Sequence, residues 1–152
     1  MDVYTKLKEI GLDLPSSGAV AGVYKPVKQA GSLLFLSGQL PIRTDGTIIQ
    51  GKLGAELGIE DGQEAARRCA LGALGVLHNY LGDLNKIKSV VKTLAFIQSA
   101  PGFNDQPQVA NGASELLVEL FGEERGKGAR SAVGTNELPK NASVEIEFIV
   151  EV

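Results

Sequence analysis

The amino-acid sequence predicts a single α+β domain, in which two helices pack on one face of a β-sheet. Two segments, Ile59–Leu81 and Val109–Phe121, repeat apolar residues at intervals of three and four, as amphipathic helices do. Runs that are apolar, or that alternate apolar with polar residues, precede, separate and follow these helices, which is typical of strands. The 152 residues fit one domain, and no repeat or linker divides residues 1–152.

The first third of the chain predicts a short helix and then a β-hairpin. Met1–Ile10 has helical spacing, Asp2 can cap its start, and Gly11 can end it. Leu14–Gly22, rich in glycine, serine and proline, is expected to be a loop. Gly31 lies in the tight turn of the hairpin, where glycine is favoured. The two strands of the hairpin are Val23–Gln29 and Leu33–Ser37.

The middle of the chain predicts a long helix and then a strand with two apolar faces. Ile59–Leu81 has many small residues on its apolar side, so it can lie close to a sheet, and Gly82 ends it. In Ile87–Ser99, successive side chains should point to opposite faces. One face would hold Val91, Thr93, Ala95 and Ile97, and the other Val90, Leu94 and Phe96. Such a strand is expected in the centre of a sheet or under a partner.

The last third predicts a helix and two closing strands. The helix is Val109–Phe121, and the charged segment Gly122–Gly128 is expected to be a loop. The two strands, expected to pair as a final hairpin, are Ser131–Thr135 and Ser143–Val152. Both long helices are expected to pack on one face of the sheet, so no long helix remains to cover the other face. We therefore expect that oligomerisation covers the second face.

Composition argues against several classes of function. A formal net charge of −3 argues against a broad nucleic-acid interface, which carries a basic excess. The single cysteine, Cys69, allows no intramolecular disulfide, and Met1–Gly11 lacks the apolar core of a signal peptide or membrane span, so a cytoplasmic location is expected. Cys69 and the single histidine, His78, lie in a helical pattern; Cys69 is interpreted as a buried structural residue and His78 as structural or solvent-facing. No phosphate-loop or metal-loop spacing is present, and no cofactor or metal is expected.

Two residues near the C-terminus could carry chemistry. Arg130 begins the penultimate strand, and a guanidinium group is a planar fork that binds a carboxylate with two hydrogen bonds. The last strand has one clean core face, made by Val144, Ile146, Phe148 and Val150. Its other face carries Glu145, Glu147, Ile149 and Glu151. From the residues alone, Arg130 could also be a surface arginine, and the acidic face of the last strand could simply face solvent. If the two strands pair, an acid can lie near Arg130.

Two blocks of the sequence match a known family. The first is Gly128-Ala129-Arg130-Ser131-Ala132-Val133, followed by Leu138-Pro139 and Val144-Glu145-Ile146-Glu147. The second is Leu36-Ser37-Gly38-Gln39-Leu40-Pro41, with Tyr24 before it and Asn111 between the two blocks. In this order and spacing they resemble the RidA/YjgF family of enamine/imine deaminases, also labelled endoribonuclease L-PSP. The resemblance covers about residues 20–152.

The resemblance implies a chorismate mutase-like fold with a mixed sheet, and a homotrimer with pockets between its subunits. Arg130 would bind the carboxylate of a 2-imino acid or its enamine tautomer, and Glu145 would position or activate the attacking water. The residues that would shape the pocket are Tyr24, Ser37, Gly38, Asn111, Ser131 and Ala132. The products would be a 2-oxo acid and ammonia, so the protein would be a hydrolase acting on carbon–nitrogen bonds, without cofactor or metal.

The sequence also departs from the family pattern. Ala132 stands where the family often has cysteine, the interval before Arg130 is longer around Gly122–Gly128, and residues 1–17 form an N-terminal helical extension. These departures indicate a longer, divergent branch and leave the substrate open, as well as the choice of Glu145 or Glu147 as the pocket acid. Two alternatives remain: a trimer that binds small carboxylates or acts as a chaperone without catalysis, and an endoribonuclease. RNA cleavage is harder to support with one histidine and an acidic chain.

Overall fold

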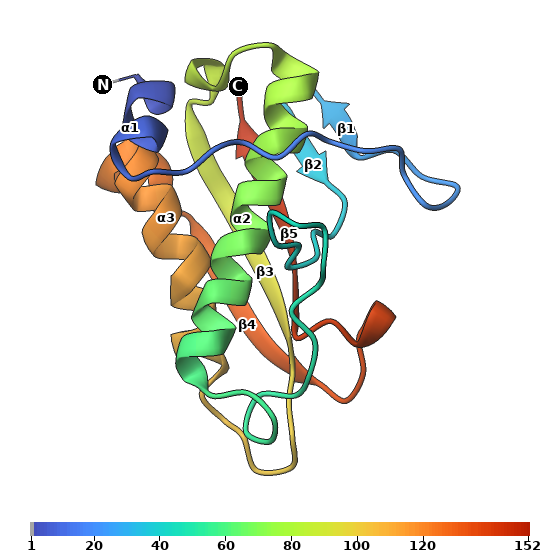
Figure 1. Ribbon diagram of the computed structural model, residues 1–152. Helices are drawn as coiled ribbons and strands as arrows, with labels where there is room; N and C mark the ends of the chain where they lie inside the picture. Colours follow the sequence, from blue (N-terminus) through green and yellow to red (C-terminus); the bar gives the residue numbers. More distant parts are fainter. Residues whose placement is uncertain (1) are drawn as a thin grey trace.

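Five strands form one mixed sheet, and two long helices cover one of its faces (Figure 1). The computed structural model describes residues 2–152. The strands are β1 (Val27–Ala30), β2 (Leu33–Leu36), β3 (Ser89–Gln98), β4 (Ala129–Thr135) and β5 (Val144–Glu151). Their order is β1-β2-β5-β3-β4, and all neighbouring pairs are antiparallel except β3 and β4. The predicted α+β architecture is confirmed.

The helices agree closely with the periodicity of the sequence. They are α1 (Val3–Glu9), α2 (Ile59–Leu81) and α3 (Gln106–Gly126), with short 3-10 turns η1 (Leu84–Lys86) and η2 (Pro139–Asn141). The bounds of α2 are those predicted, and Gly82 ends it in the left-handed conformation with φ 76°. The Asp2 side chain caps α1 by accepting a hydrogen bond from the backbone N–H of Thr5 at 2.8 Å. Within residues 2–152, no helix is both long and apolar enough to cross a membrane.

The second long helix extends beyond the prediction at both ends. α3 begins three residues before the predicted Val109–Phe121. It also continues through most of Gly122–Gly128, so the prediction of a loop there is wrong. The chain kinks at Gly122, where φ is 82°, and then resumes its helical turns. Arg125 anchors this last part by donating a hydrogen bond to the backbone carbonyl of Ile87. A tertiary contact thus keeps a charged, glycine-containing segment helical.

β1 begins later than predicted. It starts at Val27, whereas the sequence predicted a strand from Val23. Its partner β2 ends at Leu36, which is the register partner of Val27, so earlier residues have no strand to pair with. The turn between β1 and β2 contains Gly31 with φ 61°, as the predicted hairpin requires.

β3 contains a bulge that changes the predicted facing of its first residues. The register shifts between Val90 and Lys92, and one inserted residue moves the following side chains to the opposite face. Val90 is therefore buried on the helix side, although the alternation predicted Val91 there. Beyond the bulge the prediction is confirmed, because Thr93, Ala95 and Ile97 are buried together.

The predicted final hairpin is wrong. β4 and β5 do not pair, because β3 lies between them and pairs with both. The reason is the connection through α3: a strand, a crossover helix and a second strand in one sheet form a unit whose strands run parallel. β4 therefore returns parallel to β3 on its outer side and becomes an edge strand, whereas β5 inserts between β2 and β3.

The core lies between the helices and one face of the sheet. The predicted core face of β5 is confirmed, because Val144, Ile146, Phe148 and Val150 are all buried. On the opposite face, Phe35 of β2 and Val133 of β4 remain 42% exposed. Among the residues that the structure describes, no helix covers this second face, which we call the open face (Figure 1).

Candidate functional site

Arg130 lies near the start of the edge strand β4, on the face of the sheet that the helices cover. Its register partner Thr93 is buried on that face. The guanidinium reaches α3, where Nη1 donates to Asn111 Oδ1 at 2.8 Å and to Ser114 Oγ at 3.2 Å. Nη2 donates to the carbonyl oxygen of Pro107 at 3.3 Å. The structure therefore brings Arg130 together with Asn111.

All three acceptors around Arg130 are uncharged oxygen atoms. The ion pairs within residues 2–152 join other side chains, and none places a carboxylate within 4.0 Å of this guanidinium. A guanidinium has five N–H donors, and the three bonds to α3 leave the Nε–H and one Nη2–H without an acceptor among residues 2–152. Arg130 thus keeps both its charge and two donors for an anionic ligand.

The helix that holds Arg130 is fixed by a close contact with α2. A Cβ added to Gly112 would stand 2.0 Å from the backbone oxygen of Gln63, so the two helix backbones touch at this point. The side chain of Gln63 also donates to the carbonyl of Gln108 at 3.0 Å. Gly112 directly follows Asn111, and this contact therefore sets the position of the amide that orients Arg130.

Glu145 lies on the central strand β5 and points to the open face. It alternates with the buried core residues of β5 and is itself half-buried. A Cβ added to Gly38 would stand 2.5 Å from Glu145 Oε2, so the carboxylate lies directly against this glycine. Burial, and secondly the charge of Glu147, raises the pKa of Glu145 above its ordinary value. A carboxyl group with a raised pKa exchanges protons closer to neutral pH, as general acid–base chemistry requires.

Tyr24, Ser37 and Gly38 belong to the same region as Glu145. Ser37 directly precedes Gly38 at the end of β2, and its hydroxyl donates to the carbonyl of Lys25 at 2.6 Å. That bond ties the segment containing Tyr24, which is 52% exposed, to the end of β2. We call Tyr24, Ser37, Gly38 and Glu145 the glutamate half-site. We call Arg130, Asn111 and Ser114 the arginine half-site.

The two half-sites do not meet within one chain. Arg130 faces the helices, whereas Glu145 faces the open side of the sheet, and β3 lies between their strands. The expectation that a hairpin would bring an acid close to Arg130 is therefore wrong. The cause is the parallel return of β4, which places the arginine at the sheet edge and the acid near the sheet centre.

Ser131 and Ala132 point to opposite faces of β4. Ser131 Oγ accepts a hydrogen bond from Lys92 Nζ at 3.1 Å on the open face. Ala132 packs against the hydrophobic core, on the same side as Arg130. The part that each would play in a pocket stays a prediction.

Ser114 contacts the candidate residue Arg130, although the sequence patterns did not single it out. A signal for it was present, because residues three apart share one face of a helix and Ser114 follows Asn111 by three. A helical serine in isolation is unremarkable, and only the packing of β4 beside α3 brings Arg130 to it.

Cys69 and His78 have the surroundings of structural residues. Cys69 is fully buried, and burial raises the pKa of its thiol well above the ordinary value, which disfavours the reactive thiolate. His78 Nδ1 lies 2.8 Å from the hydroxyl of Tyr4, which links α2 to α1. Within residues 2–152, no three metal-binding side chains come together.

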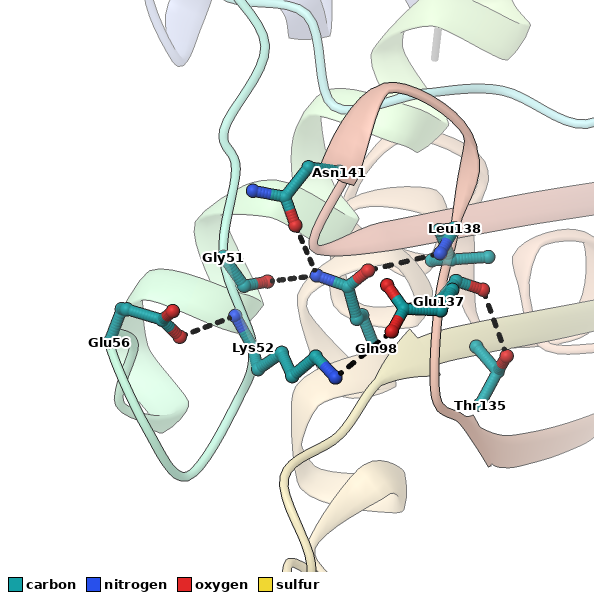
Figure 2. A network of polar contacts seen from close by, with 8 residues as sticks. All are labelled: Gly51, Lys52, Glu56, Gln98, Thr135, Glu137, Leu138 and Asn141. Carbon is teal, nitrogen blue, oxygen red and sulfur yellow. Dashed lines mark hydrogen bonds and ion pairs between the residues drawn. The ribbon is translucent and has the colours of Figure 1, made fainter.

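A buried glutamine organises the loops at the C-terminal end of β3. Figure 2 shows that Gln98 Nε2 donates to the carbonyl of Gly51 at 3.0 Å and to Asn141 Oδ1 at 2.8 Å. Its Oε1 accepts from the backbone N–H of Leu138 at 3.0 Å. All polar atoms of this side chain have partners, so it serves to hold the Leu138-Pro139 segment in place rather than to react.

The chain matches one protein family over nearly its whole length, and named relatives align with most of it. The family model described as "YjgF/chorismate mutase-like, putative endoribonuclease" matches residues 4–152. Protein TCP17 of Trypanosoma cruzi is 44% identical over 98% of this chain and 93% of its own length. A 2-iminobutanoate/2-iminopropanoate deaminase of Dermatophagoides farinae is 32% identical over 91% of this chain and 93% of its own.

Solved structures have the same fold. The protein Atu1372 of Agrobacterium tumefaciens, of unknown function, is 42% identical, with a TM-score of 0.90 over 99% of this chain and 91% of its own. TdcF of E. coli, solved with bound serine, is 25% identical, with a TM-score of 0.61 over 90% of this chain and 93% of its own.

Proposed function

The chain belongs to the YjgF/chorismate mutase-like family, and from this premise we propose that it is a hydrolytic deaminase of small 2-imino acids. The observation that carries the proposal is the environment of Arg130. Three uncharged oxygens orient its guanidinium, no carboxylate of residues 2–152 pairs with it, and two donors remain unused. Such a group selects a ligand that carries a carboxylate.

The proposed reaction adds water across the carbon–nitrogen double bond of the imine. Arg130 would hold the carboxylate, and Glu145 would orient the water and accept its proton as the oxygen attacks the imine carbon. The nitrogen takes up a proton to form a carbinolamine, which then collapses to the 2-oxo acid and ammonia. Imines hydrolyse readily in water, so orientation of the substrate and of one water molecule supplies most of what the site must provide.

The separation of the half-sites supports a pocket shared between two copies of the chain. In our proposal, the arginine half-site of one subunit faces the glutamate half-site of the next in a homotrimer. The open face carries exposed apolar side chains such as Phe35 and Val133, which suits contact with another subunit. We also propose a cytoplasmic location, where a single cysteine stays reduced.

Two relatives support this substrate class. The Dermatophagoides protein, 32% identical, bears the name of a 2-iminobutanoate/2-iminopropanoate deaminase. The structure of TdcF contains serine, which carries a carboxylate next to an amino-bearing carbon, as a 2-imino acid carries one next to its imine carbon.

The test is acceleration of imine hydrolysis. An amino-acid oxidase generates 2-iminobutanoate in the assay, and the rate of 2-oxobutanoate release is compared with buffer alone. We expect the protein to accelerate release, and Arg130→Ala to abolish the acceleration without loss of folded structure. Arg43→Ala is the matched control, since the acceptors of Arg43 within the described chain are also uncharged oxygens, those of Thr47 and Ile48. Wild-type protein that never exceeds buffer would reject the proposal for this substrate.

Binding without turnover is the second candidate, because the arginine half-site is complete without Glu145. In that case, calorimetry detects 2-oxobutanoate binding that depends on Arg130, while imine hydrolysis stays at the rate of buffer. Endoribonuclease activity is the third candidate, since the family description includes it. It requires RNA cleavage that survives repurification and disappears in Glu145→Gln; the single histidine and net charge of −3 do not favour it.

A further inference from the structure

We infer that Ser114 is a positioning residue for Arg130, which directs the unused donors of the guanidinium toward the ligand carboxylate. The inference rests on the proposed function, because it assigns a purpose to the same half-site. None of the sequence motifs described above includes Ser114, so they do not indicate this role.

The geometry gives Ser114 and Asn111 complementary parts. Both accept hydrogen bonds from Nη1, at 3.2 Å and 2.8 Å, so both hydrogens of that nitrogen are taken. The carbonyl of Pro107 takes one hydrogen of Nη2. Pro107, Asn111 and Ser114 are spaced by four and three residues and form one stripe along α3. These bonds hold the guanidinium through Nη1 and one hydrogen of Nη2. The Nε–H and the second Nη2–H make no bond to this stripe.

The lack of charge on these acceptors distinguishes Arg130 from the arginines of α2. Arg67 lies 3.8 Å from the carboxylate of Glu119, and Arg68 lies 2.8 Å from that of Glu64. A carboxylate partner would also fix the direction of Arg130, but it would compete with the ligand for the positive charge. A serine hydroxyl and an amide oxygen fix the direction and leave the charge available.

Packing on both sides holds the stripe of α3 in place. Val109, Ala110 and Ala113 on the same helix are buried, and Gly112 touches the backbone of α2. Loss of the Ser114 hydroxyl would therefore leave one Nη1 hydrogen unpaired instead of drawing the helix closer. The guanidinium would then turn more freely about its Nε–Cζ bond. Its free N–H donors would therefore point toward the ligand carboxylate for less of the time.

The first experiment measures this rotation directly and needs no ligand. Nitrogen-15 NMR of the arginine side chains gives the rotation rate about Nε–Cζ, with the Arg130 signal identified by its loss in Arg130→Lys. We expect rotation about tenfold faster in Ser114→Ala, because hydrogen bonds to charged groups are worth roughly a factor of ten or more. Ser114→Thr retains the hydroxyl and should stay close to wild type. Equal rates in wild type and Ser114→Ala would overturn the inference.

The second experiment separates positioning from general structure. Calorimetry compares binding of 2-oxobutanoate with that of 2-oxobutanamide, its uncharged amide. Ser114→Ala should weaken binding of the acid about tenfold and leave that of the amide unchanged, whereas Ser89→Ala, a partly buried serine of β3, should change neither. Equal weakening of acid and amide would indicate a merely structural role and reject the inference. If wild-type protein binds neither, the proposed function fails for this ligand, and the rotation rate still decides the role of Ser114.

Discussion

Arg130 and Glu145 lie on opposite faces of one sheet, with strand β3 between the strands that carry them. The arginine is bound to α3 on the covered face, and the glutamate lies against Gly38 on the open face. No side-chain movement can bring two groups through a sheet. For the proposed reaction, which needs both groups, we therefore expect the arginine of one chain to act with the glutamate of another.

Mixing of two inactive variants tests this arrangement. Arg130→Ala and Glu145→Ala should each be inactive alone, because each lacks one half-site. After subunit exchange in equal amounts, about a quarter of the interfaces would combine an intact arginine with an intact glutamate, and activity should return to about a quarter of wild type.

The control for this experiment is a chain that carries both substitutions. Mixed with Arg130→Ala, the double variant contributes no Arg130, so no interface can regain activity. If verified subunit exchange restores nothing in the first mixture, the shared pocket is excluded.

Asn111→Asp tests the need for an uncharged partner at Arg130. The substitution keeps the shape and the acceptor oxygen at 2.8 Å from Nη1, but it adds a negative charge beside the guanidinium. We expect binding of 2-oxobutanoate to weaken by about tenfold or more, while thermal stability stays close to wild type. Asn104→Asp adds the same charge at an exposed position before α3 and should leave binding unchanged, as measured by calorimetry.

Gly38→Ala tests the contact that positions Glu145. The new methyl group would stand 2.5 Å from Oε2, and the flexible carboxylate would have to move away. We expect kcat to fall at least about tenfold with little change in melting temperature, because the displaced atoms end a side chain. Gly18→Ala, where no atom lies within 4 Å of the new methyl group, should retain full activity. An active Gly38→Ala variant would contradict a catalytic position for Glu145.

Gly112→Ala tests the contact between the two long helices. Its methyl group would stand 2.0 Å from the backbone oxygen of Gln63, which can move only if a helix shifts. We expect the free energy of unfolding, measured with urea, to fall by at least about 2 kcal/mol. In Gly72→Ala, the nearest atom is the side-chain oxygen of Gln39 at 3.2 Å, so stability should stay similar or rise. Equal stability of Gly112→Ala and wild type would show that α3 can move.

The raised pKa of Glu145 predicts a pH-dependent effect of Glu145→Gln on stability. A carboxyl whose pKa is higher in the folded state stabilises the fold fully below its unfolded value, near 4.5, and loses this contribution as pH rises through the folded pKa. Glutamine does not ionise. The variant should therefore gain stability relative to wild type as pH rises from 4 to 7, measured by urea unfolding at both values. A difference that is the same at both pH values would show that burial does not penalise the ionised carboxylate.

Local patterns in the sequence predicted most of the elements. The spacing of apolar residues predicted α2 with its observed bounds, and strict alternation predicted the buried face of β5. Capping by Asp2 and termination at Gly82 were also predicted, because these effects act within one turn of a helix. The spacing of the motifs also indicated Arg130 and Asn111, whose side chains share a hydrogen bond in the structure.

The errors concern features that depend on distant contacts. Gly122–Gly128 has the composition of a loop, but the bond from Arg125 to Ile87 holds most of it in α3. The bulge at the start of β3 is a mismatch between two strands, so neither strand alone indicates it. Ser114 contacts Arg130 only because β4 lies beside its helix.

The sequence by itself determined most of the helices and strands, the buried face of β5, and Arg130 and Asn111 as candidates for chemistry. Only the tertiary structure decided that β4 returns parallel at the sheet edge, that Arg130 and Glu145 face opposite sides, and that three uncharged oxygens hold the guanidinium. The physical reason is range: periodicity and capping act between near neighbours in the chain, whereas strand order and side-chain partners follow from how crossover connections pack.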